Sequence, residues 1–479
     1  MIQSERNFTM FFADISEAKE VRNGRIVASF QRALDRHASR DAVTECLVDL
    51  GVAMHEVGFA SHEIEACVVE TATSLGTMAE VFATPTALFM GVGPRGDQRT
   101  LLHRLEPAND DLSGMADVLD IAAGICERHL SPTAASEQLH RLAQNRTIAP
   151  TRREHAVWIA AFALSSAGAA ALFGGGFSEV LVACGLALLI ACVARLSELG
   201  TTPVLGECVV AMTASVGASL AGSFGWVSAP DIVTLSSLII FLPGLAMTRG
   251  LADLARRDLA AGTARLMGAL TSFLSLGLGV ALGQAISRGA VGLLTLPVPV
   301  ASAPTSQWVL KAAAILVTPP ALAILLHARR REVLAIGVGT LIASLGTQFG
   351  AALVGPNLGV GLGALALGIF ANGWANRMRR PTATILVPGL ILLVPGTMGL
   401  RSLELLMRAQ TVDGMAIAFE TLWVSVSLVA GLVVANAVHP PRRVARPTHA
   451  RSGRVPPSQV PRPAPPPTRD YVGATVPVP

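Results

Sequence analysis

The sequence contains one proline–glycine–arginine spacing twice, each time inside a long apolar stretch. Pro243-Gly244 is followed after four residues by Arg249, and Pro395-Gly396 is followed after four residues by Arg401. Proline removes a backbone hydrogen-bond donor and frees the carbonyl one turn earlier, whereas glycine lets a chain or ligand approach the backbone closely. Inside a membrane, such freed polar groups are tolerated only where protein or a water-filled cavity meets them. Pro388-Gly389 precedes the second motif and predicts another interruption of the same helix.

One such motif alone is typical of a structural kink, because proline and glycine are common in membrane helices. Its recurrence at corresponding positions supports a binding path as much as a structural kink, since interrupted helices expose backbone groups at membrane depth. The two arginines could attract an anionic carboxylate into either entrance, or could anchor their helices at the membrane surface, which is the commoner role. The candidates for the path are therefore Pro243, Gly244, Arg249, Pro388, Gly389, Pro395, Gly396 and Arg401.

Ionisable residues inside apolar stretches are functional candidates, because their burial in a membrane is expensive. Glu420 lies about two turns into the last stretch and Lys311 about one turn into the sixth, both near the outer face. They could pair, or Glu420 could carry a proton whose binding is favoured by burial. Glu207 falls at the inner start of the third stretch, where we expect water to reach it. Four amides could hydrogen-bond a zwitterion or join helices to one another: Gln284, Gln348, Asn357 and Asn372.

The composition indicates a membrane protein. Of 479 residues, 51% are hydrophobic and 15% are charged, whereas soluble domains carry about 25% charged residues. This excludes an ordinary soluble enzyme and a disordered chain, and a net charge of +4 is too small to indicate nucleic-acid binding. Ten stretches approach the roughly 20 residues that cross a bilayer. They are 155–174, 178–194, 206–226, 231–248, 263–286, 307–326, 333–350, 355–375, 383–400 and 414–438.

Arginines gather in alternate loops between these stretches, before the first and after the last, which marks the inner face of the membrane. The pattern predicts ten spans with both termini cytoplasmic. Residues 1–20 contain several charges and no apolar run long enough for a signal peptide.

The apolar region repeats itself at an offset of 152 residues, as the two proline–glycine motifs show. Residues 155–286 and 307–438 hold five stretches each, and an odd number requires the second repeat to be inverted relative to the first. The expected fold is an α-helical polytopic membrane protein of two inverted five-helix repeats. Close helix packing is expected along a stripe of glycines, which are Gly355, Gly359 and Gly363.

The polar residues before the apolar region predict a small α+β cytoplasmic domain at 31–150, after a flexible lead at 1–30. The expected elements are helices at 44–54 and 61–75 separated by Gly58, strands at 77–92 (interrupted at Thr84-Pro85-Thr86) and 100–105, and helices opened by Asn109 and by Ser131-Pro132. His55-Glu56 and His62-Glu63 lack a metalloprotease spacing and are expected to be exposed.

The remaining features predict neither a metal nor a cofactor. The six cysteines form no CxxC pair or zinc spacing and are expected to be small buried side chains. Residues 440–479 are rich in proline and arginine and predict a disordered cytoplasmic tail, either inert or bound by a proline-recognising partner.

Several motifs together resemble the threonine/serine exporter family, over about residues 44 to 438. The resemblance rests on Leu50-Gly51 through Gly58, Leu75-Gly76, Thr84-Pro85-Thr86, Asp110-Asp111-Leu112 and the two proline–glycine–arginine segments. It implies a cytoplasmic domain before ten spans of the bacterial inner membrane, and export of small hydroxy amino acids at the expense of the proton gradient. Related chains linked to dicarboxylate export leave the substrate open.

The expected function is a secondary exporter of small amino acids that works by alternating access of two inverted halves. Its expected partners are the substrate, protons and the lipid bilayer, with homo-oligomerisation left open. The sequence lacks GxxxxGK[ST], which argues against a built-in ATPase. One alternative is a membrane-embedded enzyme with a hydrolase-like N-terminal domain, which requires a nucleophile with converging partners. Another is a scaffold that works through the proline-rich tail.

Overall fold

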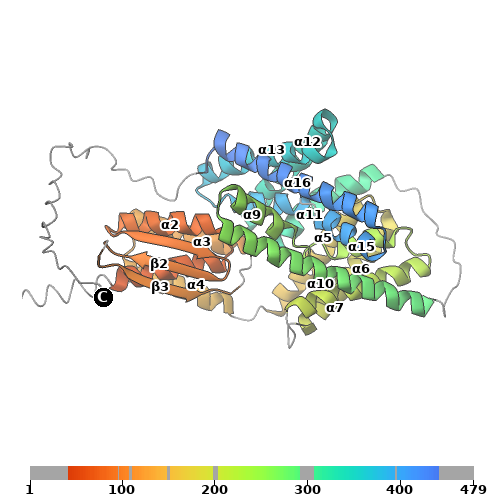
Figure 1. The fold of residues 1–479 in the computed structure, drawn as a ribbon, viewed down its shortest axis with the longest axis horizontal. Coiled ribbons are helices and arrows are strands. Elements are labelled where there is room, and N and C mark those ends of the chain that lie inside the picture. The colour runs from red at the N-terminus through yellow and green to blue at the C-terminus, as the bar shows by residue number, and fades with distance from the viewer. Residues whose placement is uncertain are drawn as a thin grey trace, which may run out of the picture. The chain divides into compact units, whose positions relative to one another are not determined.

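The computed structural model describes residues 41–94, 96–106, 110–147, 151–197, 203–291, 307–393 and 396–441. The expected lead at 1–30 lies outside these residues, as does the expected tail from residue 442 onward. The described chain is mostly helical, with one small sheet near its beginning (Figure 1).

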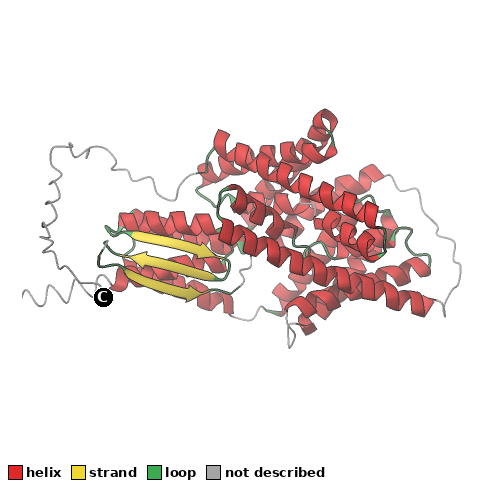
Figure 2. Ribbon diagram, in the orientation of Figure 1, coloured by secondary structure: helices red, strands yellow, loops and turns green. Residues whose placement is uncertain are grey.

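The N-terminal region, residues 41–147, combines four helices with a three-stranded antiparallel sheet of order β1-β2-β3 (Figure 2). Its elements are a helix over residues 41–56, α2 (Ser61–Ser74), β1 (Ala79–Thr84), β2 (Ala87–Val92), β3 (Arg99–Arg104), α3 (Leu112–Cys126) and α4 (Pro132–Thr147). Gly58 has a φ of 94°, a left-handed conformation that ends the first helix where the sequence predicts. The Thr84 hydroxyl accepts a hydrogen bond from the Ala87 N–H at 3.0 Å and closes the predicted hairpin turn.

One face of the sheet is covered by helices and the other is open. Leu88 and Met90 are buried, and a Cβ on Gly51 would lie 2.7 Å from the Leu88 side chain, so the first helix packs closely on β2. Phe82 and Phe89 lie on the open face, where their ring centroids are 6.0 Å apart.

The start of α3 differs from the expectation. The cap of this helix is Asp111, whose carboxylate accepts the Gly114 N–H at 2.9 Å; Asn109, the expected cap, lies outside the described residues. Asp111 meets the requirement for a cap, because its side chain accepts a hydrogen bond from the first turn of the helix.

Nine helices of the described chain are long and apolar enough to cross a membrane. The helical region contains α5 (Arg152–Leu172), α6 (Phe177–Ser197), α7 (Pro203–Ser223), α8 (Pro230–Ser237), α9 (Gly244–Ala255), α10 (Leu259–Val291), α11 (Gln307–Leu325), a 3-10 turn (Arg330–Glu332), α12 (Val333–Val354), α13 (Pro356–Met378), α14 (Ala383–Leu393), α15 (Gly396–Met407) and α16 (Thr411–Val438). The fourth apolar stretch is divided between α8 and α9, each too short to span alone, so a crossing there stays a prediction.

The first expected interruption is confirmed, because α8 ends at Ser237 and α9 begins only at Gly244. The interruption expected at Pro388-Gly389 is wrong, since α14 continues through both residues. A single proline removes only one backbone hydrogen bond, and a membrane helix can compensate for that loss locally. Pro395 lies outside the described residues, between the end of α14 and the start of α15 at Gly396.

The packing of the first five helical segments recurs in the second five. Helix α7 packs on α10 as α13 packs on α16, and α9 packs on α10 as α15 packs on α16. Helices α5 and α11, which open the two halves, pack on each other. Between the halves, α10 contacts α15 and α16 contacts α9. Arg257 and Ala409, 152 residues apart, both have a positive φ, at 66° and 60°.

Glycines bring neighbouring helices into backbone contact, as expected in a membrane. A Cβ on Gly350 would lie 2.6 Å from the Gly359 carbonyl oxygen, and a Cβ on Gly363 would lie 2.8 Å from the Ala343 oxygen, so α12 and α13 pack closely. Gly355 is different: it has a φ of 90°, precedes α13 and has open space around it, so it forms a turn and not part of the packing stripe.

The cysteines divide by region. Cys46 and Cys67 are buried in the N-terminal region, and burial raises the pKa of each thiol to about 12. Cys126, Cys184 and Cys208 are half-buried and Cys192 is exposed on α6, which corrects the expectation that all six are buried. An apolar helix that faces lipid tolerates a small thiol on its outer surface as readily as in the core.

Candidate functional site

The two helices that follow the proline–glycine motifs meet at their first residues. Gly244 and Gly396 are both buried, and a Cβ on Gly396 would lie 3.4 Å from the Gly244 Cα and 3.2 Å from the Leu242 Cβ. The N-terminal ends of α9 and α15 therefore adjoin at the boundary between the two halves. Free N–H groups and positive dipole ends characterise such helix starts, and an anionic group fits there.

Aromatic and hydroxyl side chains surround the first of these helix starts. The Phe241 ring, two residues before Pro243, packs edge-on against Phe162 of α5 with centroids 5.9 Å apart. The Thr248 hydroxyl donates to the Gly244 carbonyl oxygen at 3.1 Å, a hydrogen bond within the first turns of α9. Pro243 itself is the residue that precedes α9, with a φ of −78° and a ψ of 28°.

Two buried hydroxyls of the helical region lack hydrogen-bond partners. Ser166 on α5 and Thr318 on α11 are 0% and 1% exposed, and neither hydroxyl oxygen has a partner among the described residues. A Cβ on Gly168 of α5 would lie 3.2 Å from the Thr318 Cβ, so Thr318 belongs to the contact between α5 and α11, whereas Ser166 lies two residues before Gly168 on α5. Ser166 and Thr318 are 152 residues apart, the offset that relates the two motifs; sequence reasoning missed them, although that offset could have found them.

The two motif arginines differ in their surroundings. Arg249 donates to the Asp110 carboxylate at 2.7 Å, and the two side chains are 24% and 20% exposed. Arg401 is exposed and forms no ion pair with any described residue. The arginine of the first half is thus held by the N-terminal region, which the sequence does not predict.

Acidic side chains on and just before α3 bind arginines of both halves. Besides the Asp110–Arg249 pair, Asp117 accepts from Arg329 at 2.6 Å and Asp120 accepts from Arg380 at 3.0 Å. The Leu112 N–H also donates to the Leu326 carbonyl oxygen at 3.0 Å. We call these contacts the α3 clamp. Since Arg249 belongs to the first half and the other two arginines to the second, the clamp connects the two halves.

A buried charge cluster adjoins the clamp. Asp253, near the end of α9, is 2% exposed and lies 3.2 Å from Arg265 of α10. The His62 ring nitrogen of α2 lies 3.8 Å from the same carboxylate. His62 is therefore turned toward the helical region, which corrects the expectation that it faces solvent.

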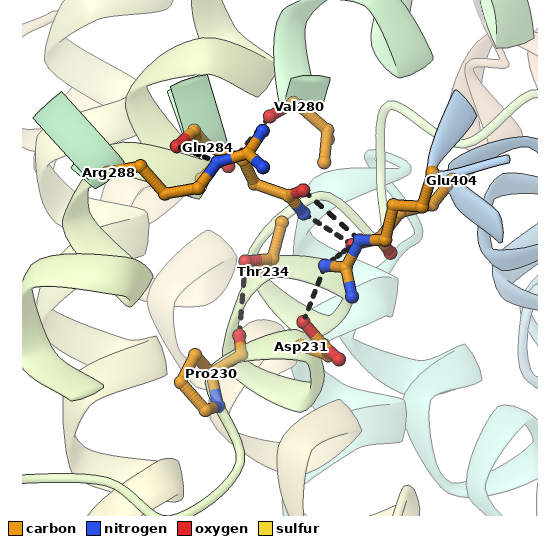
Figure 3. A network of polar contacts seen from close by, with 9 residues as sticks. Pro230, Asp231, Thr234, Val280, Gln284, Arg288 and Glu404 are labelled. Atoms are coloured by element: carbon orange, nitrogen blue, oxygen red, sulfur yellow. Dashed lines mark hydrogen bonds and ion pairs between the residues drawn. The ribbon is translucent and has the colours of Figure 1, made fainter. Parts of the chain in front are cut away.

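A second polar network joins the halves through α15 (Figure 3). Glu404 accepts hydrogen bonds from Gln284 of α10 and from Arg408, and its side chain is 12% exposed. Arg408 also lies 3.6 Å from Asp231 at the start of α8. We call this set the α15 network. Glu404 was not a sequence candidate, although its spacing of four residues from Arg408 is a recognisable helix ion pair.

The amide side chains serve mainly to join helices. Gln284 belongs to the α15 network, and Asn372 of α13 donates to the Asn436 side chain at 2.8 Å and to the His439 carbonyl oxygen at 2.7 Å. Gln348 is exposed and contacts Ser344 within its own helix, and Asn357 lies one residue into α13.

The ionisable candidates Glu420 and Lys311 do not meet. Glu420 is exposed on α16 and Lys311 is half-buried on α11, and no ion pair joins them within the described chain. Glu207, by contrast, is half-buried between helices: its carboxylate accepts the Ser272 hydroxyl of α10 at 2.9 Å. Its environment is drier than the sequence suggests, because α10 runs alongside the start of α7.

The N-terminal region holds one histidine in a fixed environment. His55 is 4% exposed, which corrects the expectation of an exposed residue, and its Nε2 lies 2.9 Å from the Glu106 carbonyl oxygen. Burial lowers the pKa of His55 below its usual value, so the neutral ring is favoured. Burial likewise raises the pKa of Glu65, whose carboxylate accepts the Ala83 N–H at 2.9 Å.

Comparison with known proteins identifies the family. Residues 45–287 match the ThrE model of threonine/serine exporters, and residues 311–438 match a second model described as threonine/serine exporter, ThrE. The chain is 24% identical over 377 residues to the threonine/serine exporter of Corynebacterium glutamicum, which covers 78% of this chain and 76% of that protein. It is also 24% identical over 373 residues to pheromone-regulated membrane protein 10 of Pichia sorbitophila, covering 74% of this chain and 36% of that longer protein. No solved structure matches the chain. A family model that covers half of the sequence, together with nine apolar helices in the described residues, shows that the chain is a multi-pass membrane protein of the threonine/serine exporter family.

Proposed function

We propose that the protein exports threonine and serine from the bacterial cytoplasm, driven by an inward flow of protons across the inner membrane. Family membership supports amino-acid export, and the matched packing of the two groups of helices supports a transporter built from two repeats. With five crossings in each repeat, the repeats have opposite orientations, and both termini lie in the cytoplasm. The observation that carries the proposal is the contact between the starts of α9 and α15 at Gly244 and Gly396.

In this mechanism the substrate carboxylate binds where the two helix starts adjoin. The dipoles of α9 and α15 both direct their positive ends to this point, so an anionic group is stabilised without a buried side-chain cation. The partnerless hydroxyls of Ser166 and Thr318 are acceptors suited to an ammonium group or to the hydroxyl that threonine and serine share. Pro388 and Gly389 stay candidates for lining the same path from within α14.

The α3 clamp and the α15 network then act as the inner and outer gates. Each joins the first half to the second through charged hydrogen bonds, and α9 and α15 each supply side chains to one of them. Alternating access requires one set of contacts to break while the other holds. In the proposed topology the clamp faces the cytoplasm, so the N-terminal region regulates access from that side.

Two other functions are alternatives to this proposal. Export of small dicarboxylates would use the same helix starts, because they suit any carboxylate. A hydrolase in the N-terminal region would centre on His55, but the ring is held by a backbone carbonyl and is 4% exposed, which favours a structural role. Self-association and a partner for the proline-rich tail remain further proposals.

Inside-out membrane vesicles provide the test of this function. With an imposed proton gradient, acid inside, vesicles that contain the protein should accumulate labelled threonine and serine, and vesicles without it should not. Collapsing the gradient with a protonophore should abolish the accumulation. Accumulation that is indifferent to the gradient would contradict proton coupling, and preferential uptake of succinate would favour dicarboxylate export.

A further inference from the structure

The carboxyl group of Glu207 has an unusual environment among the acidic residues of the described helices. It lies on α7, one turn from the helix start, and its Oε1 accepts the Ser272 hydroxyl of α10 at 2.9 Å. Its Oε2 is buried and has no hydrogen-bond partner. Neither an arginine, nor a lysine, nor a backbone N–H of the described residues bonds to this carboxyl.

The other buried acids of the described helical region each have a backbone N–H or an arginine as a partner, although one oxygen of Asp253, Asp258 and Glu332 is also buried without a hydrogen bond. Glu179 accepts the N–H groups of Gly176 and Ser228, at 2.9 and 2.7 Å, and Glu332 accepts the Arg329 N–H at 3.2 Å. Glu404 and Asp253 each bind an arginine, and Glu420 is exposed. Arginines and backbone N–H groups favour the ionised form of a carboxyl. Glu207 has instead one hydroxyl partner, which can donate to a carboxylate or accept from a carboxylic acid.

Charged groups of the helices around Glu207 are engaged elsewhere. On α10, Arg265 binds Asp253 and Arg288 donates to the Gln284 carbonyl oxygen. On α6, Glu179 is held by loop N–H groups, and on α8, Asp231 lies beside Arg408. Among the side chains that the structure describes on α6, α8 and α10, no charged group bonds to Glu207, and an ionised carboxyl there is costly while a protonated one is not.

The position of Glu207 connects it to the moving parts of the proposed mechanism. Helices α7 and α10 are in backbone contact along their length: a Cβ on Gly283 would lie 2.8 Å from the Met212 oxygen, and the Ser215 hydroxyl donates to the Val280 oxygen at 2.9 Å. Helix α10 also packs on α9 and on α15, the two helices that start at Gly244 and Gly396. A change in the Glu207–Ser272 contact thus acts on the helix that touches both halves of the substrate site.

We propose that Glu207, with Ser272 as its positioning partner, is the proton-binding site that couples export to the proton gradient. The proton arrives from water on one side and is released to water on the other, and no covalent bond changes besides the O–H bond of the carboxyl. The protonated carboxyl keeps α7 and α10 together. The ionised carboxyl requires water and loosens the contact between these two helices around Glu207 and Ser272. This inference rests on the proposed function, because it names the residue that performs the coupling.

The test compares Glu207→Gln with the matched variant Glu420→Gln in proteoliposomes. Glu207→Gln should lose accumulation driven by a proton gradient and keep the exchange of labelled for unlabelled threonine, whereas Glu420→Gln should keep both. Ser272→Ala should shift the pH at which accumulation is half-maximal, and Glu207→Asp should restore part of the coupling. Unchanged coupling in Glu207→Gln would overturn the proposal, as would loss of both activities in a variant that elutes as a folded protein.

An infrared measurement keeps this inference separate from the identity of the substrate. In a pH titration of the reconstituted protein, the spectrum of the wild type minus that of Glu207→Gln should contain the band of a protonated carboxyl that disappears as pH rises, and the wild type minus Glu420→Gln should lack this band. A wild-type minus Glu207→Gln spectrum without such a band would overturn the inference. If the Glu207 band is found but the wild type moves neither threonine nor serine, the proposed substrate is wrong and the proton site stands.

Discussion

Leucine in place of Gly396 is expected to abolish threonine transport while the protein still folds and inserts. At this position even a Cβ would lie 3.2 Å from Leu242 and 3.4 Å from Gly244, so a larger side chain must separate α15 from α9. Overpacking costs about 1–3 kcal/mol. A cost of this size lowers the population of the state in which α9 and α15 are in contact by at least about fivefold. The added side chain also occupies the proposed carboxylate site, so exchange and gradient-driven accumulation should both be lost.

Gly337→Leu is the matched control for this prediction. Gly337 lies on α12, and a Cβ at this position would meet no other atom within 4 Å, so the same substitution there should leave transport unchanged. Threonine exchange in proteoliposomes measures both variants. Wild-type exchange in Gly396→Leu would show that the substrate passes elsewhere and would contradict the site.

Reversing the charge of Asp110 should open the α3 clamp. Asp110→Arg places two cations together at the Arg249 contact, where the native pair is separated by 2.7 Å and is only 20–24% exposed. A hydrogen bond between charged groups contributes about 1.5–3 kcal/mol, so transport should fall by about tenfold. Hydrogen exchange over residues 112–126 should accelerate, because α3 loses one of its attachments.

The double variant Asp110→Arg with Arg249→Asp should recover most of both properties, since it restores an ion pair with reversed polarity. The exposed pair Glu137 and Arg141 on α4 provides the control, because its side chains are 65% and 69% exposed and such pairs contribute little. Reversing Glu137 should leave transport and exchange unchanged. Asp110→Arg behaving as wild type, or failure of the double variant to recover, would argue against a clamp.

Local structure follows from the sequence wherever one short segment specifies it. The hairpin at Thr84-Pro85-Thr86, the end of the first helix at Gly58 and the start of α4 at Pro132 are all found as predicted, because each depends on the backbone preferences of a few residues. The interruption before Gly244 is found for the same reason. Pro388 shows the limit of this reasoning: a proline weakens a helix, but its neighbours decide whether the helix ends.

Contacts between distant segments could not be predicted in this way. The Asp117–Arg329 pair joins residues 212 positions apart, and no local pattern specifies which arginine an exposed-looking aspartate will bind. His55 and His62 were expected to be exposed because they lack a metalloprotease spacing, yet one is buried in the N-terminal region and the other faces Asp253. Glu207 was expected to be wet because it lies near a helix start, but the long helix α10 covers it.

Electron–electron distance measurements between spin labels test most directly whether the two halves open alternately. One pair of labels replaces Arg256 and Met378, both exposed and on different halves beside the α3 clamp; the other replaces Trp226 and Val412, exposed near the α15 network. The six native cysteines are first replaced by alanine. On addition of threonine under a proton gradient, one distance should lengthen as the other shortens. Distances that stay fixed, or that lengthen together, would contradict alternating access.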